Sequence, residues 1–151
     1  MPQSLSAVNI HLIFSTKERR AFLRDSNVRS QLHAYLGGIS KTHGCPPLIV
    51  GGVEDHVHLL CQFGRTITQA DWVKELKRAS NLWLKNQGPA YADFQWQSGY
   101  GDFSVGQAEL GEVKRYIANQ EAHHGTQNFQ DEYRALLQRH NVEWDERYVW
   151  D

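Results

Sequence analysis

Two short patterns contain residue types whose spacing suits chemistry. His56 and His58 are separated by one residue inside an apolar run, and Tyr116 precedes Gln120 by four positions in a segment with helical periodicity. Side chains two apart on a strand point to the same face, so the histidines are predicted to project together. Positions i and i+4 of a helix are neighbours, so Tyr116 and Gln120 form a second pair. If this helix lies against the histidine strand, Gln120 completes a three-ligand metal site beside a phenol.

Each pattern taken alone is more often structural than functional, and the two together favour the functional interpretation. Two roles are equally open for Asp55, either to orient a ligand imidazole or to act as a capping or turn residue. His123 and His124 are adjacent, and adjacent helical residues point in different directions, so a joint metal site is not expected there. A favourable interaction with the end of the helix dipole is the better hypothesis for these two histidines.

Length and composition limit the class of protein. At 151 residues the chain is expected to form a single domain spanning 1–151. Lys plus Arg is 16 against Asp plus Glu 17, a net charge of −1, so any nucleic-acid site must be a local basic patch. The two cysteines, Cys45 and Cys61, argue against a thiolate zinc site or a disulfide framework and fit a cytoplasmic location. No signal peptide or membrane span is recognised in the sequence.

Periodicity and turn residues predict alternating strands and helices. Asp25 and Thr68 are candidate caps of two helices, the first ending at Gly44 and the second near residue 87. Strands are predicted at 8–14, 48–53, 56–63 and, as a bulged strand or strand pair, 94–105. Further helices are predicted at 107–123 and 130–140.

This order of elements is typical of a split βαβ fold of the α+β class. Such a fold has an antiparallel sheet with two helices on one face. The added helix with Tyr116 is expected to cover part of the other face. The apolar face of the histidine strand then meets the two helices, and the histidines face the added helix. The first strand is expected to be half-buried.

Five ordered blocks resemble one known family. They are the stretches 14–20, 55–60, 96–105, 116–124 and 145–151. In this order they resemble the single-tyrosine HUH transposases of the smallest bacterial insertion sequences and their REP-associated relatives. The resemblance covers nearly the whole chain, and it implies a ferredoxin-like or RRM-like core.

The resemblance also implies a mechanism. Tyr116 would attack single-stranded DNA at hairpin-bearing ends and form a 5′-phosphotyrosine link, which keeps the ester available for rejoining. His56, His58 and Gln120 would hold a divalent metal, magnesium or manganese. The active unit would be a homodimer, and the four glycines within 99–111 give the Tyr116 helix freedom to dock in cis or on the partner.

The DNA-contacting residues are less clearly marked. Lys17, Arg19 and Arg20 form the densest basic cluster and are the favoured candidates for hairpin phosphates. The basic residues of the second predicted helix are interpreted as its solvated face; they are Lys74, Lys77, Arg78 and Lys85. Trp96, Tyr100 and Phe103 could stack on bases, but a core role is favoured for these aromatic residues.

Two other classes of protein stay open. A histidine-triad nucleotide hydrolase would need a third histidine where Leu60 stands and would leave Tyr116 and Gln120 without a role. An inactive, domesticated RRM-like nucleic-acid-binding module would keep the fold without the chemistry.

Overall fold

The fold is built on one four-stranded antiparallel sheet. The computed structural model describes residues 2–151. The spatial order of the strands is β2-β3-β1-β4, so β3 and β1 are central. The strands are β1 (Asn9–Ser15), β2 (Pro47–Gly52), β3 (His56–Gln62) and β4 (Gly101–Val105).

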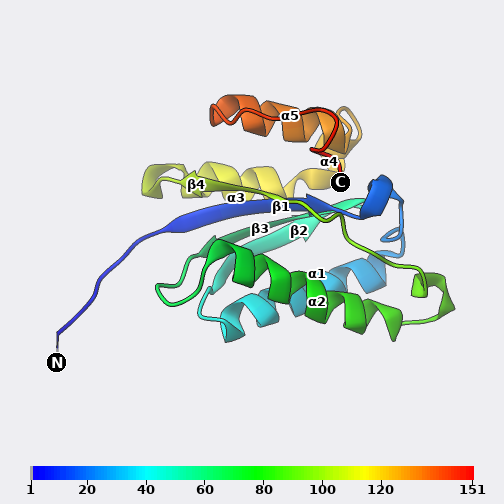
Figure 1. Cartoon of the computed structure of the whole chain (residues 1–151), viewed down its shortest axis with the longest axis horizontal. Coiled ribbons are helices and arrows are strands. Elements are labelled where there is room, and N and C mark those ends of the chain that lie inside the picture. The colour runs from blue at the N-terminus through cyan, green and yellow to red at the C-terminus, as the bar shows by residue number, and fades with distance from the viewer. Residues whose placement is uncertain (1) are drawn as a thin grey trace.

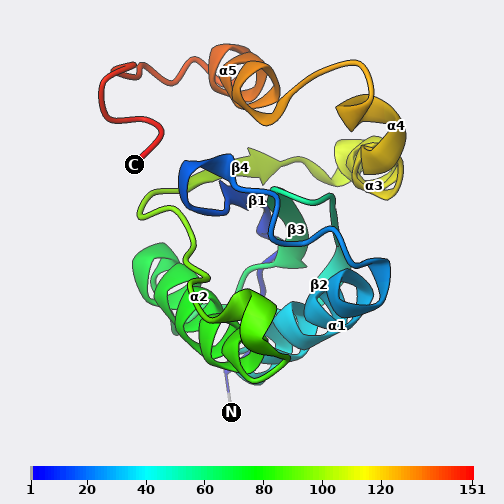
Figure 2. The same cartoon turned by 90° about the vertical axis from the view of Figure 1, so that its right-hand side faces the viewer.

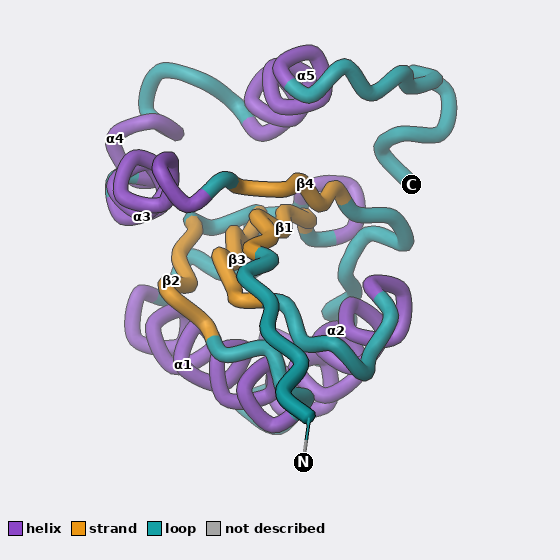
Figure 3. Tube along the Cα trace, turned by 90° about the vertical axis from the view of Figure 1, so that its left-hand side faces the viewer, coloured by secondary structure: helices purple, strands orange, loops and turns teal. Residues whose placement is uncertain are grey.

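Helices cover both faces of the sheet. α1 (Ser26–Thr42) and α2 (Gln69–Lys85) lie side by side on one face, as Figure 2 shows. The opposite face is covered by three shorter helices, which lie above the sheet in Figures 1 and 3. They are α3 (Leu110–Ala118), α4 (Gln120–His124) and α5 (Phe129–Arg139). The predicted α+β class, with an antiparallel sheet and two helices on one face, is confirmed.

The main core lies between the sheet and the α1–α2 layer. The largest side chains of this core are fully buried, and they come from β1, β3 and both helices: Leu12, Phe14, Leu32, Leu36, Leu59, Trp72 and Leu76. Both predicted caps are present. Asp25 accepts hydrogen bonds from the backbone N–H groups of Asn27 and Val28, and Thr68 accepts one from Asp71. Such caps each stabilise a helix by about 1 kcal/mol. Among residues 2–151, no helix is both long and apolar enough to cross a membrane.

The predicted continuous helix over 107–123 is wrong. The segment begins with a 3-10 turn at Gln107–Glu109 and continues as α3 to Ala118. Asn119, with φ −100° and ψ 23°, leaves the helical region, and α4 starts at Gln120. Tyr116 and Gln120 therefore belong to two helices joined by a bend.

The predicted strand or strand pair over 94–105 is shorter than expected. Only β4 is a regular strand, and Trp96 forms a single bridge with Thr16. The Trp96 indole donates to Ser80 Oγ at 2.9 Å inside the core, and Phe103 is also buried. The preference for a core role of these aromatic residues is confirmed for Trp96 and Phe103.

Strand β1 is more buried than the sequence predicted. All seven of its residues are buried, although a half-buried strand was expected. The reason is that the second face of the sheet is covered by α3 and α5, which the local pattern of β1 cannot reveal. His11 is consequently an interior residue, with 3% exposure.

Lys77 corrects the interpretation of the basic residues of α2 as a solvated face. Its Nζ donates to the backbone carbonyls of Gln97, Ser98 and Gly99 at 2.7, 3.1 and 2.7 Å. Lys77 thus fastens α2 to the loop before β4. Lys74 and Lys85 are exposed as expected.

Candidate active site

Strand β3 presents His56 and His58 on the face opposite the main core. Val57, Leu59 and Cys61 point into the main core, so the alternation predicted from the sequence is present. Both histidines are fully buried, because α3, α4 and α5 close over them. Since β3 is paired on both sides, a slip in register would exchange the two faces and is strongly opposed.

The residues from the second sequence pattern lie against these histidines. Gln120 Oε1 is 3.0 Å from His56 Nε2, and the Tyr116 ring centroid is 5.8 Å from that of His58. The expected docking of the tyrosine segment on the histidine strand is confirmed. The structure therefore brings Tyr116, His56, His58 and Gln120 together, although they come from three elements.

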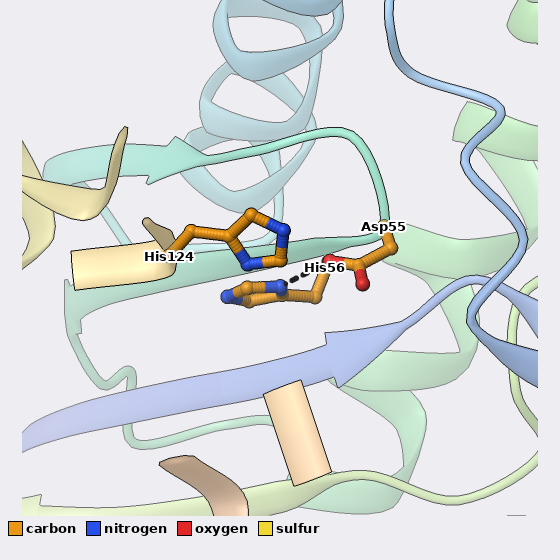
Figure 4. Close-up of side chains that lie close together, drawn as sticks. All are labelled: Asp55, His56 and His124. Atoms are coloured by element: carbon orange, nitrogen blue, oxygen red, sulfur yellow. Dashed lines mark hydrogen bonds and ion pairs between the residues drawn. The ribbon is translucent and has the colours of Figure 1, made fainter. Parts of the chain in front are cut away.

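Two residues at the edge of the site contact His56 or lie beside it. Asp55 Oδ1 is 2.7 Å from His56 Nδ1, as Figure 4 shows. The other ring nitrogen, Nε2, is the one near Gln120. This contact matches the orienting role considered for Asp55, since it leaves Nε2 toward the site. The His124 ring lies 5.8 Å from that of His56, and its Nε2 pairs with Glu54 at 2.9 Å. The His123 ring instead lies tilted against the Tyr116 ring, with ring centroids 4.7 Å apart.

Two further residues, which the sequence did not predict, contact the histidine pair. Glu132 on α5 places Oε1 2.6 Å from His58 Nε2 and 3.7 Å from His56 Nε2. His11 on β1 places Nε2 2.8 Å from His58 Nδ1. A weak signal for Glu132 existed, because it lies three residues after Phe129 on the apolar face of its helix. For His11 the sequence gives no such signal.

The buried charges perturb one another. Burial lowers the pKa of His56, but the carboxylates of Asp55 and Glu132 outweigh it and raise that pKa to about 9. Burial lowers the pKa of His58. Although burial opposes ionisation of Glu132, the two imidazoles hold its pKa well below the usual range. Burial and the Glu132 carboxylate raise the pKa of the Tyr116 phenol, so the phenol is protonated near neutral pH.

The donor set suits a divalent cation. Within residues 2–151, the buried polar atoms without a hydrogen-bond partner include His58 Nε2, Gln120 Nε2 and both carboxylate oxygens of Glu132. The 2.6 Å approach of His58 to Glu132 is therefore a close contact not aligned as a hydrogen bond. The candidate ligand atoms of His56, His58 and Glu132 all lie within 4.8 Å of one another. Imidazole nitrogens and carboxylate oxygens that converge in this way are donors that metal ions take, whereas the amide nitrogen of Gln120 is not one.

A small cavity gives access to Tyr116. It has a volume of about 210 Å³ and lies between α3, α5 and the end of β4. Its lining includes Tyr116, Glu132 and His11 from the cluster, together with Glu112, Arg139 and His140.

The predicted DNA-binding residues lie elsewhere. Lys17, Arg19 and Arg20 are on and just after the 3-10 turn that follows β1. Lys17 and Arg20 line a hollow of about 330 Å³ together with Lys85. Arg19 is partly buried, and its guanidinium carbon lies 5.8 Å from the centroid of the Trp150 ring. The candidate phosphate-binding surface and the histidine cluster are thus separate features.

A buried histidine pair on a central strand with a helical tyrosine beside it combines candidate metal ligands with a candidate nucleophile, which suits an enzyme that cleaves phosphodiesters with the help of a metal. Leu60 is packed with Val105 and Ile117, so a core leucine stands where a histidine-triad hydrolase would have its third histidine.

The IS200-like transposase family model matches residues 4–120, more than half of the chain. The chain belongs to this family and is a HUH single-strand DNA nuclease, as the resemblance implied.

Two solved structures are similar to this chain. One is a protein of Deinococcus radiodurans R1 described as a candidate transposase, with 26% identity and a TM-score of 0.62; the match covers 80% of this chain and 95% of that one. The other is a REP-associated tyrosine transposase bound to a REP hairpin, with 8% identity and a TM-score of 0.56; the match covers 85% of this chain and 73% of that one. The second likeness concerns the fold alone. No curated protein matches the sequence.

Proposed function

We propose that Tyr116 is the nucleophile with which this transposase cleaves single-stranded DNA, and that the whole chain acts as one transposase domain. The observation that supports this role most directly is the position of the Tyr116 ring, 5.8 Å from that of His58. The reaction exchanges one phosphoester for another. Tyr116 Oη bonds to the phosphorus as the bond from phosphorus to the 3′ oxygen breaks. The phenol loses its proton, the 3′ oxygen gains one, and the 5′ phosphate stays on Tyr116 for rejoining.

His56, His58 and Gln120 are the proposed ligands of a magnesium or manganese ion. When bound, such an ion supplies positive charge that stabilises the non-bridging oxygens of the phosphate. Asp55 and His11 orient the two histidine rings. Each contacts the ring nitrogen that points away from the proposed ion, namely Nδ1 of His56 and Nδ1 of His58. The raised pKa of Tyr116 means that the phenol needs help to lose its proton.

A covalent adduct tests the nucleophile. The protein is incubated with a labelled single strand containing a hairpin and Mn²⁺ or Mg²⁺, then denatured. We expect a labelled protein band with the wild type and with Tyr148→Phe, an exposed tyrosine far along the tail. Tyr116→Phe should give none. An adduct that persists in Tyr116→Phe would assign the nucleophile elsewhere, and no adduct with the wild type would favour an inactive binding module.

Cleavage and hairpin binding should depend on different residues, so that a substitution can remove one activity and keep the other. The structural neighbour was solved with a REP hairpin, and we propose a hairpin ligand for this chain. Lys17, Arg19 and Arg20 are the proposed contacts for its phosphates, because affinity for DNA comes largely from phosphate neutralisation. His58→Ala should abolish cleavage and retain the hairpin in a gel shift. Lys17→Ala with Arg20→Ala should weaken retention at 150 mM salt, whereas the exposed Lys41→Ala should not.

We also propose that the enzyme acts as a homodimer in the cytoplasm, with the Tyr116 helix serving the histidines of either subunit. Excision needs two cleavage events, and a dimer keeps both in one complex. Mixing Tyr116→Phe and His58→Ala subunits distinguishes docking of the Tyr116 helix within its own subunit (cis) from docking on the partner subunit (trans). A trans arrangement regenerates one active centre in the mixed dimer. Continued inactivity of a verified mixed dimer would exclude it.

A further inference from the structure

Glu132 is a buried carboxylate without a hydrogen-bond partner among residues 2–151. It lies on the buried face of α5, next to Tyr133 and three residues after Phe129, and only 1% of it is exposed. A carboxylate at an apolar position of a helix requires strong partners, because an isolated buried charge is costly. Neither of its oxygens has a hydrogen-bond partner among the described residues.

The contacts of Glu132 are with the candidate metal ligands. Oε1 lies 2.6 Å from His58 Nε2 and 3.7 Å from His56 Nε2. The other nitrogen of His58 already faces His11 at 2.8 Å. A cation bound by the Glu132 carboxylate and by Nε2 of His56 and of His58 would give each of these buried atoms a partner.

The chemistry of the donor set points the same way. Two imidazoles alone favour zinc or another soft ion, whereas magnesium and manganese prefer oxygen. Gln120 offers one amide oxygen near His56. A carboxylate adds a negatively charged oxygen, which makes the site better suited to a harder ion.

We infer that Glu132 is a direct ligand of the catalytic divalent ion, supplied by α5, in addition to His56, His58 and Gln120. This inference rests on the proposed function. It gives α5 a task beyond covering the sheet: binding of the ion links α5 to β3. The bound ion should therefore slow hydrogen exchange of the α5 backbone amides, which a merely structural carboxylate would not do.

Metal binding is the test. Mn²⁺ is titrated into the full chain without DNA, and affinity is measured by calorimetry. Hydrogen exchange of α5 is followed with and without Mn²⁺. Glu132→Gln keeps the shape of the side chain and should weaken Mn²⁺ binding at least about 10-fold. It should also remove the protection of α5 by Mn²⁺. Asp131→Asn, an exposed neighbour on the same helix, removes the same charge and should bind as the wild type does.

The possible outcomes distinguish a failure of the Glu132 ligand role from a failure of the proposed metal site itself. If the wild type binds Mn²⁺, His58→Ala does not, and Glu132→Gln binds as tightly as the wild type or more tightly, then Glu132 is not a ligand and the three-residue site stands. If neither the wild type nor His58→Ala binds Mn²⁺, the proposed metal site itself is wrong. Glu132→Ala serves as a second variant, and circular dichroism of each variant checks that it is folded.

Discussion

At the scale of single residues, the orientation of each imidazole is set by the nitrogen that faces away from the ligand cluster. Asp55 contacts Nδ1 of His56, and His11 contacts Nδ1 of His58. Partners of this kind fix the tautomer and the ring orientation of a metal ligand, and their loss typically reduces metal affinity about 10- to 100-fold. His11 is therefore a positioning residue for His58.

His11→Leu should lower the affinity for Mn²⁺ about 10-fold, because His58 Nδ1 loses its partner. His11→Gln keeps a polar nitrogen or oxygen near the position of the ring Nε2 and should recover most of the affinity. Calorimetric titration of Mn²⁺ measures both. Equal affinity in the wild type and a well-folded His11→Leu variant would show that the contact with His11 is only packing.

At the scale of elements, the position of Tyr116 depends on how closely α3 approaches β2. A Cβ atom on Gly51 would lie 2.9 Å from Ile117 Cγ2 and 3.0 Å from the Ile117 carbonyl oxygen. Only glycine allows this approach, so Gly51 marks a close contact between β2 and α3. Tyr116 is adjacent to Ile117, and the seat of α3 therefore sets its distance from His58.

Gly51→Ala should displace α3 and with it the phenol. A misplacement of about 1 Å can cost about 100-fold in rate, and overpacking costs about 1–3 kcal/mol of stability. We expect the cleavage rate, measured by adduct formation, to fall strongly. The free energy of unfolding, measured with urea, should fall too little to leave much of the protein unfolded. Gly38→Ala is the matched control, since a Cβ there has no neighbour within 4 Å. A Gly51→Ala enzyme with wild-type cleavage would show that α3 tolerates a shift.

At the scale of the whole molecule, the packing of the layers also perturbs ionisable groups that are not part of the candidate metal site. His33 on α1 has a buried Nε2 without a hydrogen-bond partner among residues 2–151. Burial, followed by the nearby Arg29, lowers its pKa to about 4. In the unfolded chain the imidazole titrates near 6.5. Between these two values the unfolded state binds more protons than the folded state.

Stability should therefore decrease as the pH falls from 6.5 toward 4. The contribution of His33 is at most about 1.4 kcal/mol per pH unit, less where solvent reaches the ring. His33→Gln should make urea unfolding less dependent on pH in this window. An unchanged slope in the variant would assign the acid sensitivity to other groups.

Much of the fold follows from local patterns. Alternation along β3 separates His56 and His58 from the core residues, and side-chain caps begin α1 and α2 where the sequence places them. These features depend on residues within a few positions of one another. The spacing of Tyr116 and Gln120 likewise marks the second half of the cluster, although the bend at Asn119 was not predicted.

The histidine pair, the tyrosine segment and the order of the elements can be predicted from the sequence, because each is encoded by spacing along the chain. Tertiary packing is what places Glu132 beside the histidine pair, His11 against His58, and Lys77 against the loop before β4. These contacts join residues far apart in sequence: 47 positions separate His11 from His58, and 64 separate His56 from Gln120. Local periodicity does not encode which residues of distant helices pack on the second face of a sheet. It is this packing that buries polar residues such as His11 and Glu132 against the histidine pair.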